Sequence, residues 1–262
     1  MPHVRVIVLA AQRKGQVDPL AIRFGTSHKC VVPLHGEALI AHVLRTLSAH
    51  PDVETVMVSI ETEMFQSIAD LAANDAVTAD KIRFCTAADN IADSVRNAAE
   101  GHQGPLIVTT ADNALLKAAS INAMVGALQS HDVAIAMATR DAVLAAHPEG
   151  QRRFYRFKDG EFSNCNLYGL RDVSALKAAE FFRGGGQFAK KASRIVQAFG
   201  LINLLLLRLR LVSLPTGLDR IARRIGMTIA PVILRDGTQA IDVDNDRTYA
   251  IVEHLMAQQH AA

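Results

Sequence analysis

Apolar, β-branched runs alternate with amphipathic helical patterns through the first half of the chain. Short runs of this kind are typical of strands that are buried on both faces of a sheet. The alternation predicts an α/β fold: a three-layer α/β/α, Rossmann-like sheet that is mixed but mostly parallel. The predicted strands are Val4–Leu9, Thr55–Ile60, Ile82–Cys85, Leu106–Thr109 and Val133–Ala138, and the predicted helices are Leu39–Leu47, Glu63–Ala73, Ile91–Ala99 and Leu116–Leu128.

A β-hairpin is predicted after this alternating region. Two polar-aromatic segments, Arg153–Phe157 and Phe162–Leu170, flank an Asp-Gly dipeptide. Asp-Gly between two such runs is a signal for a tight hairpin turn. We therefore expect these two segments to pair as the arms of the hairpin.

A basic, mostly helical stretch follows the hairpin. Residues 183–235 contain ten Lys or Arg and one acid, and a last strand and closing helix are expected at Met227–Leu234 and Asn245–Met256. We expect one domain over residues 1–262, in which residues 171–226 form a basic helical insertion or cap.

Three roles remain open for the basic stretch. It can be a helical subdomain with solvated arginines, a cap over a substrate site, or a peripheral membrane contact through residues 183–224. Its charge suits an anionic or lipid-linked partner. The stretch contains few aromatic residues and no recognisable nucleic-acid-binding module. We therefore expect no nucleic acid as partner.

Composition narrows the cellular setting. Half of the 262 residues are hydrophobic, which is enough for a substantial core. Cys30, Cys85 and Cys165 lie far apart in the sequence. Their spacing fits neither a disulfide framework nor a zinc site. The apolar N-terminal run is too short for a signal peptide, and Leu201–Leu214 is shorter than the ~20 residues that cross a bilayer. We expect a cytoplasmic protein, with membrane association left open.

The first predicted strand runs into a loop of small and basic residues. Ligands of open α/β sheets bind beyond the carboxyl ends of the strands. Small residues let the backbone approach a triphosphate and cations neutralise it, although an ordinary loop with solvated cations has the same composition. The loop residues are Ala10, Ala11, Gln12, Arg13, Lys14 and Gly15.

Lys29 precedes an apolar run, a turn at Gly36 and a helix that continues through Leu44. With the loop after the first strand, this order resembles the NTP transferase superfamily, which includes molybdenum-cofactor guanylyltransferase and the sugar-phosphate and phosphocholine nucleotidyltransferases. Gln12 stands where that family has its first glycine, and His28 stands where it has a proline.

The resemblance implies roles for the residues of both motifs. Arg13 and Lys29 would be catalytic, because the family's basic residues hold the phosphates and stabilise charge on the departing pyrophosphate. Nucleotide contacts are implied for Leu9, Ala10, Ala11, Gln12 and Gly15.

Acidic residues follow two further strands. The resemblance implies that Asp112 is catalytic and binds a Mg²⁺ ion that bridges the phosphates, with a helix N-cap as the alternative. Asp242 and Asp244 alternate along an extended segment and should share one face. A similar segment in the family implies that Asp244 first, and Asp242 second, completes the Mg²⁺ site. Asn245 or Asp246 is expected to cap the next helix.

Two polar residues are weaker candidates. Ser94 resembles a family serine near the nucleobase, but it also fits the surface of a helix. Asn166 resembles a polar residue that faces the acceptor, although Asn next to a turn is common for local reasons. The histidines form no metal-binding pattern.

These observations predict a Mg²⁺-dependent nucleotidyltransferase. A nucleoside triphosphate, CTP or GTP first, would transfer its nucleotidyl group to a phosphorylated small-molecule or lipid-linked acceptor and release pyrophosphate. The alternatives are a nucleotide-sensing or scaffold domain without catalysis, and a glycosyltransferase on a related sheet.

Overall fold

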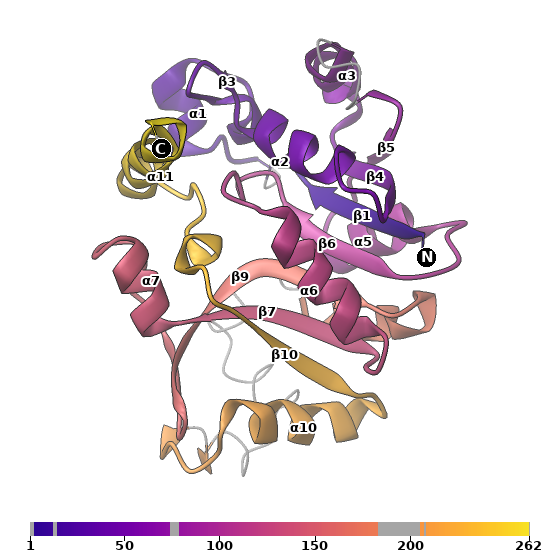
Figure 1. The fold of residues 1–262 in the computed structure, drawn as a ribbon. Coiled ribbons are helices and arrows are strands. Elements are labelled where there is room, and N and C mark those ends of the chain that lie inside the picture. The colour runs from indigo at the N-terminus through magenta and orange to yellow at the C-terminus, as the bar shows by residue number, and fades with distance from the viewer. Residues whose placement is uncertain (1–2, 13–14, 74–78, 183–204, 207, 262) are drawn as a thin grey trace.

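An eight-stranded mixed sheet forms the centre of the computed structural model, which describes residues 3–12, 15–73, 79–182, 205–206 and 208–261 (Figure 1). The strand order is β10-β7-β9-β6-β1-β4-β5, and β8 pairs with β9. β9 runs antiparallel to β6 and β7, whereas β1 is parallel to β4 and β6. The predicted mixed, mostly parallel α/β sheet is therefore confirmed.

The strands of the sheet are β1 (Val4–Leu9), β4 (Val53–Ile60), β5 (Ile82–Thr86), β6 (Leu106–Thr110), β7 (Val133–Thr139), β8 (Tyr155–Phe157), β9 (Gly160–Leu170) and β10 (Ile229–Leu234). A separate short ribbon pairs β2 (Pro33–Leu34) with β3 (Glu37–Ala38). The helices are α1 (Pro19–Phe24), α2 (Leu39–Ser48), α3 (Phe65–Ala73), α5 (Ile91–Ala99), α6 (Ala118–Leu128), α7 (Arg140–Ala146), α10 (Leu214–Ile225) and α11 (Asp246–Ala261).

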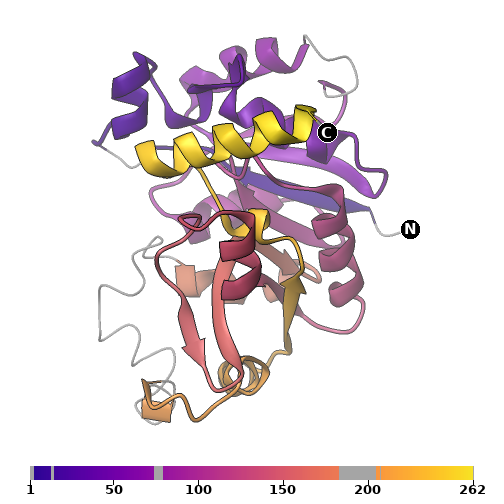
Figure 2. The same ribbon diagram turned by 60° about the vertical axis from the view of Figure 1, so that its left-hand side comes forward.

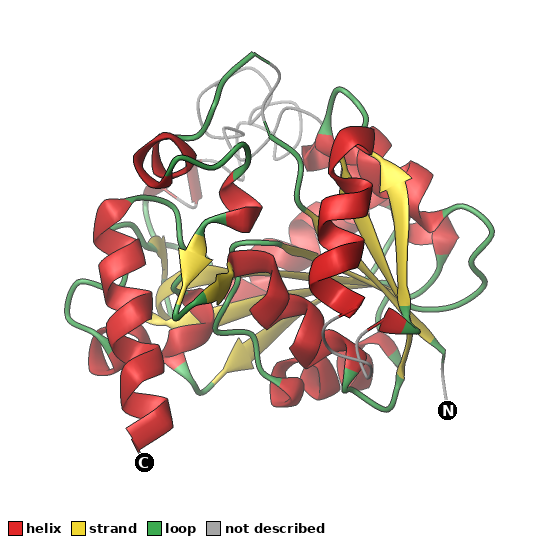
Figure 3. Cartoon of the chain, turned by 90° about the horizontal axis from the view of Figure 1, so that it is seen from above, coloured by secondary structure: helices red, strands yellow, loops and turns green. Residues whose placement is uncertain are grey.

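Helices cover both faces of the sheet, as the apolar runs require. Side chains alternate along a strand, so Val6 and Val8 of β1 enter the core shared with α2 and α6, whereas Ile7 enters the core shared with α5 and α10. Figure 3 shows helices on both sides of the strands. The strands carry apolar residues on both faces because neither face meets water.

The last helix returns to the beginning of the chain (Figure 2). Phe24 of α1 packs on Tyr249 of α11 with ring centroids 4.9 Å apart. The Tyr249 hydroxyl donates to the Pro33 carbonyl oxygen at 2.7 Å, next to the β2–β3 turn. These contacts place the segment before α11 beside the first motifs of the sequence.

Two short helices were not expected from the sequence. α1 has its N-terminus capped by Asp18, whose side chain accepts the Leu20 amide, and ends at Gly25 in the left-handed region. α7 is capped in the same way by Thr139. Helices of six and seven residues are too short to show an apolar period, so only their caps were available as signals.

The basic stretch is described in part. Within residues 171–226 the structure has a 3₁₀ helix at Val173–Phe182 and the helix α10, which contacts β10. Residues 183–204 and 207 lie outside the described part, as does most of the expected membrane contact at 183–224. The role of this stretch as an insertion or cap remains a prediction. In the part of the chain that is described, no helix combines the length and the apolar character needed to span a bilayer.

Gly237 is the clearest steric constraint of the fold. It begins a buried 3₁₀ helix, Gly237–Ala240, and a Cβ atom there would lie 2.0 Å from the Ala142 carbonyl oxygen of α7. We expect Gly237→Ala to lower the free energy of unfolding by about 3 kcal/mol, because the obstacle is backbone and cannot rotate away. Urea unfolding followed by circular dichroism measures the change.

Gly126→Ala is the matched control. Gly126 is an exposed residue of α6, and a Cβ atom added there would have no other atom within 4 Å. Alanine should therefore leave stability unchanged or raise it by up to about 1 kcal/mol. Equal effects of the two substitutions would contradict the steric argument.

Candidate active site

Three segments remote in sequence meet at the carboxyl edge of the sheet. Lys29 Nζ lies 2.5 Å from Asp112 Oδ2 and 3.2 Å from Asp244 Oδ1. Asp112 follows β6, and Asp244 lies in the segment that leads into α11. The structure thus brings together the lysine and acidic motifs that the sequence singled out, at the edge where ligands of such sheets bind.

Backbone contacts fix the acidic segments. The Val243 amide donates to the Asp112 carbonyl oxygen at 3.1 Å, which joins the two segments directly. Thr248 Oγ1 accepts the Asp244 amide at 2.8 Å, and Asn245 Oδ1 accepts the Arg247 and Thr248 amides. Asn245 is therefore the residue that caps α11.

Asp246, the other candidate for this cap, pairs instead with Arg23 at 2.7 Å. Asp112 does not act as an N-cap, because its described side-chain partner is Lys29.

The carboxylates of Asp112, Asp242 and Asp244 converge. Each offers an oxygen, and these three oxygens lie within 4.8 Å of one another. Asp242 is 9% exposed, and Oδ1 of Asp112 is buried without a hydrogen-bond partner. A buried carboxylate oxygen that lacks a donor fits a hard cation such as Mg²⁺, which prefers carboxylate oxygens. Asp242 and Asp244 lie together here, as their alternation predicted.

Charge in this cluster is unbalanced. Burial, followed by the charges of Asp112 and Asp244, holds the pKa of Asp242 well above its ordinary value. Burial alone would lower the pKa of Lys29, but the two carboxylates beside it outweigh burial and keep its pKa above the ordinary value. One lysine among three carboxylates leaves the cluster short of positive charge, which a divalent cation would supply.

Polar side chains of β9 reach the same cluster. Asn166 Nδ2 donates to Asp242 Oδ2 at 2.8 Å, and Asn164 Nδ2 donates to Asn166 Oδ1 at 3.1 Å. Asn166 has φ 48°, and the register with β7 shifts between Ile135 and Met137. Asn tolerates the left-handed region, and bulges of this kind redirect side chains next to sites. Asn166 thus lies beside the acids; its predicted role toward an acceptor is not tested by this contact.

The loop after β1 lies between its neighbouring strands. The Ala10 amide donates to the Ser59 carbonyl oxygen of β4 and the Ala111 amide donates to the Leu9 carbonyl oxygen of β1, each at 3.0 Å. Ala11 continues this loop to Gln12, and Gly15 has φ 75°, a conformation that favours glycine. Arg13, a predicted catalytic residue, lies outside the described residues.

Gln12 connects the two basic motifs. Its side-chain amide donates to the Ser27 carbonyl oxygen at 2.8 Å, and its backbone amide donates to Glu61 Oε1 at 2.9 Å. His28 Nε2 lies 3.4 Å from Glu61 Oε2. The two residues that depart from the family pattern therefore meet at one carboxylate, which holds the loop against the segment that carries Lys29.

Ser94 is not a surface residue. Its side chain is 5% exposed, and its hydroxyl accepts the Ala88 amide at 2.9 Å. The interpretation of Ser94 as a solvated helix position was wrong, because its apolar neighbours turn this face of α5 inward. Ser94 instead fixes the loop between β5 and α5.

Sequence reasoning missed three residues around the site. Glu61 directly follows β4, so its place at the carboxyl end of a strand was an available signal. Gln151 Nε2 lies 3.5 Å from Asp242 Oδ1, and Asn164 holds Asn166. No local sequence pattern around Gln151 or Asn164 predicts that these residues lie beside the acidic cluster.

The mixed sheet with a lysine and aspartate cluster at its carboxyl edge defines an α/β fold of the nucleotidyltransferase type. The chain belongs to the MobA-like NTP transferase domain family, whose model matches residues 6–195. Membership of this family supports nucleotidyl transfer as the general activity.

Solved structures share the fold over nearly the whole chain. A hypothetical transferase from Thermus thermophilus is 20% identical, with a TM-score of 0.75 over 95% of this chain and 100% of that chain. A CMP:2-keto-3-deoxy-manno-octonic acid synthetase complexed with CTP is 14% identical, with a TM-score of 0.60 over 98% and 99% of the two chains.

The 4-diphosphocytidyl-2C-methyl-D-erythritol synthase of Anaerococcus prevotii is 8% identical, with a TM-score of 0.59 over 97% of this chain and 98% of that chain. A search of curated protein sequences finds no significant match. At these identities the likeness establishes the fold.

The charge balance at Lys29 is testable without substrate. We expect Lys29→Met to lower the free energy of unfolding by about 3 kcal/mol at neutral pH in chelator, because buried carboxylates lose their cation. Asp242 has a raised pKa in the folded state, so it takes up a proton on folding and favours the folded state as the pH falls. The loss should therefore shrink as the pH falls below neutrality.

Lys117→Met is the control for this experiment. Lys117 pairs with Asp236 at 2.6 Å, but both side chains are more than one third exposed. Its loss should cost at most about 1 kcal/mol. A Lys29→Met variant that is no less stable than the Lys117→Met variant would contradict the proposed charge balance.

Proposed function

We propose that this protein transfers a nucleotidyl group from a nucleoside triphosphate, CTP or GTP first, to a phosphorylated acceptor and releases pyrophosphate. The observation that carries the proposal is the convergence of Lys29 with Asp112 and Asp244 at the carboxyl edge of the sheet. Asp242 adds a third carboxylate to that edge.

Asp112, Asp242 and Asp244 would hold a Mg²⁺ ion. The ion would neutralise charge on the phosphates, as divalent ions do in phosphoryl-group chemistry. An acceptor phosphate oxygen would attack the α-phosphorus in line while the bond to pyrophosphate breaks, so no protein nucleophile is required.

Lys29 is the described cation best placed to receive the triphosphate. Its ammonium group is held by two carboxylates, and its pKa is raised by them, so it stays protonated at neutral pH. A metal ion on those carboxylates would leave the ammonium group free to face the phosphates and the leaving pyrophosphate. Arg13 is proposed as its partner on the family resemblance.

The remaining roles follow from this arrangement. Leu9, Ala10, Ala11, Gln12 and Gly15 would line the nucleotide, with Ser94 fixing a neighbouring loop and Asn166 facing the acceptor. Residues 1–262 would act as one domain, with 171–226 as an insertion or cap. The lipid-linked alternative for the acceptor depends on the basic stretch.

One observation favours a nucleotide-sensing domain as the second candidate. The backbone amide of Gln12 donates to the Glu61 carboxylate at 2.9 Å instead of being open to a phosphate. A nucleotide would then bind without a hydrogen bond from the Gln12 amide. Binding would not by itself lead to turnover.

Substitution of Asp112 tests the proposed catalysis. Pyrophosphate release would be measured with each of the four ribonucleoside triphosphates, Mg²⁺ and a panel of phosphorylated alcohols, sugars and lipid precursors. We expect Asp112→Asn to lower the rate by about 100-fold or more, because a metal ligand loses its charge. Removal of Mg²⁺ by a chelator should abolish release in the unchanged protein.

Asp70→Asn is the control, since Asp70 lies exposed on α3 with Gln66 as partner. Its rate should stay within about twofold of the wild type. An unchanged rate in folded Asp112→Asn protein would refute the assignment. Nucleotide binding without release for every acceptor would favour the sensing domain.

A further inference from the structure

A cavity of about 630 Å³ opens beside the acidic cluster. Asp244 lines it, together with the guanidinium-bearing residues Arg152, Arg153 and Arg247. Arg152 and Arg153 precede the hairpin of β8 and β9, and Arg247 lies in the first turn of α11. We refer to this space, lined by three arginines and Asp244, as the arginine cavity.

Positive charge in the arginine cavity is only partly balanced. Arg152 pairs with Glu149 at 3.2 Å, whereas Arg247 donates to the backbone carbonyl oxygen of Glu149. Asp244, the other acid of the lining, pairs with Lys29 at 3.2 Å. Within the described ranges, no ion pair to a carboxylate is formed by Arg153 or Arg247. These two guanidinium groups therefore remain available to an anion.

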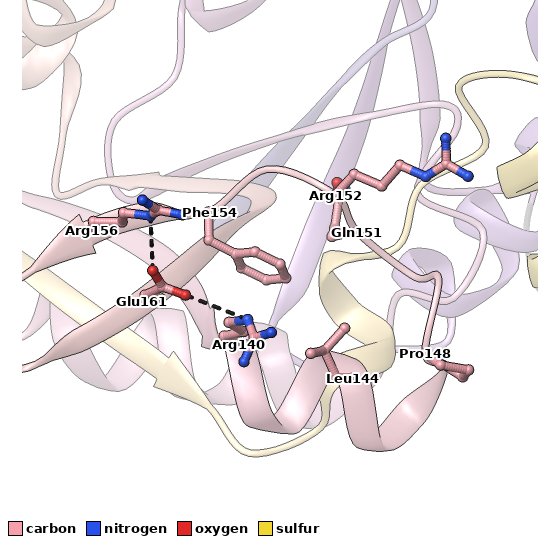
Figure 4. A pocket seen from close by; sticks show the side chains of 8 residues that line it. All are labelled: Arg140, Leu144, Pro148, Gln151, Arg152, Phe154, Arg156 and Glu161. Carbon is pink, nitrogen blue, oxygen red and sulfur yellow. Dashed lines mark ion pairs between the residues drawn. The ribbon is translucent and has the colours of Figure 1, made fainter.

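A second cavity of about 400 Å³ adjoins the first and shares Gln151 and Arg152 with it (Figure 4). Its arginines differ in that they already have a partner: Arg140 and Arg156 both pair with Glu161, at 3.4 and 2.8 Å. In Figure 4 the side chain of Arg152 points away from this paired group.

The rest of the second lining is apolar and comprises Leu144, Pro148 and Phe154. Arg140 and Arg156 are both engaged with Glu161, so the apolar side chains beside them are the part of this lining that suits the carbon groups of a ligand.

We propose that the arginine cavity binds the phosphate group of a phosphomonoester acceptor and that the second cavity receives the carbon part of the same molecule. This inference rests on the proposed nucleotidyl transfer and adds the acceptor's place to it. Asp244 belongs both to the acidic cluster and to the cavity lining, so a phosphate bound here lies next to the metal site. Guanidinium forks match phosphate oxygens in geometry and charge.

The position suits the reaction. The attacking oxygen has to be a phosphate oxygen near the α-phosphorus, and the nucleotide is proposed on the opposite side of the acids, at Lys29 and the loop after β1. Gln151 contacts Asp242 and lines both cavities, which places the acceptor site against the buried acid as well. Binding energy from the arginines would serve to orient the attacking oxygen.

Calorimetric titration of the full chain with glycerol 3-phosphate tests this site without turnover. We expect Arg153→Ala and Arg247→Ala each to weaken binding by about tenfold, since each removes a charge-assisted hydrogen bond. Arg153→Lys should restore part of the affinity. Arg83→Ala is the control, because Arg83 is an exposed residue of the edge strand β5 that donates to the Asp80 and Ile82 carbonyl oxygens, so its loss should leave binding unchanged.

Two results would overturn the inference. One is binding that is unaffected by both cavity substitutions, or lost only in Lys29→Ala, which would assign the phosphate to the proposed nucleotide site at Lys29. The other is no measurable binding of glycerol 3-phosphate or inorganic phosphate to the wild type. Circular dichroism establishes that each variant is folded.

Titration with Mg²⁺ and nucleoside triphosphates separates the two proposals. If the wild type binds nucleotide but neither glycerol 3-phosphate nor inorganic phosphate, the arginine cavity is contradicted and the proposed function is not. Absence of nucleotide binding in the wild type contradicts the proposed function.

Discussion

The ion pairs of Lys29 with Asp112 and Asp244 join the beginning, middle and end of the chain. Three carboxylates with oxygens within 4.8 Å of one another repel, and the lysine offsets this repulsion. Strand β6 leads into Asp112, the 3₁₀ helix Lys29–Val31 after α1 supplies the lysine, and α11 holds the Asp244 segment in place by packing against α1. The geometry of the site thus depends on a charge balance that the fold imposes across its whole length.

Much of the fold follows from local sequence. Val6, Ile7 and Val8 alternate between two cores, so an unbroken apolar run correctly predicted a strand covered on both faces. The acids at 112, 242 and 244 were found because they follow strands or alternate along an extended segment. Asn166 could be located by resemblance, but its left-handed conformation comes from a bulge against β7, which no local pattern records.

What the sequence could not supply are contacts that depend on tertiary packing. In the sequence, Gln12 and His28 are departures from a family pattern. In the structure both contact the carboxylate of Glu61, which follows the end of β4. Ser94 fits a solvated helix position by its sequence, but the packing of α5 buries it. The arginines at 152, 153 and 247 come from two segments that only the fold brings to one cavity.

The antiparallel direction of β9 has a consequence of its own. A parallel strand enters a site only at its carboxyl end, whereas the antiparallel β9 brings Asn164 and Asn166, from the middle of the strand, to that same edge. The hairpin can then change in length or sequence without disturbing β6, which leads into Asp112, or the 3₁₀ helix Lys29–Val31, which carries the lysine. Such an arrangement lets the two sides of the acidic cluster be built from strands of opposite direction, so that a change of loop length on one side leaves the other side in place.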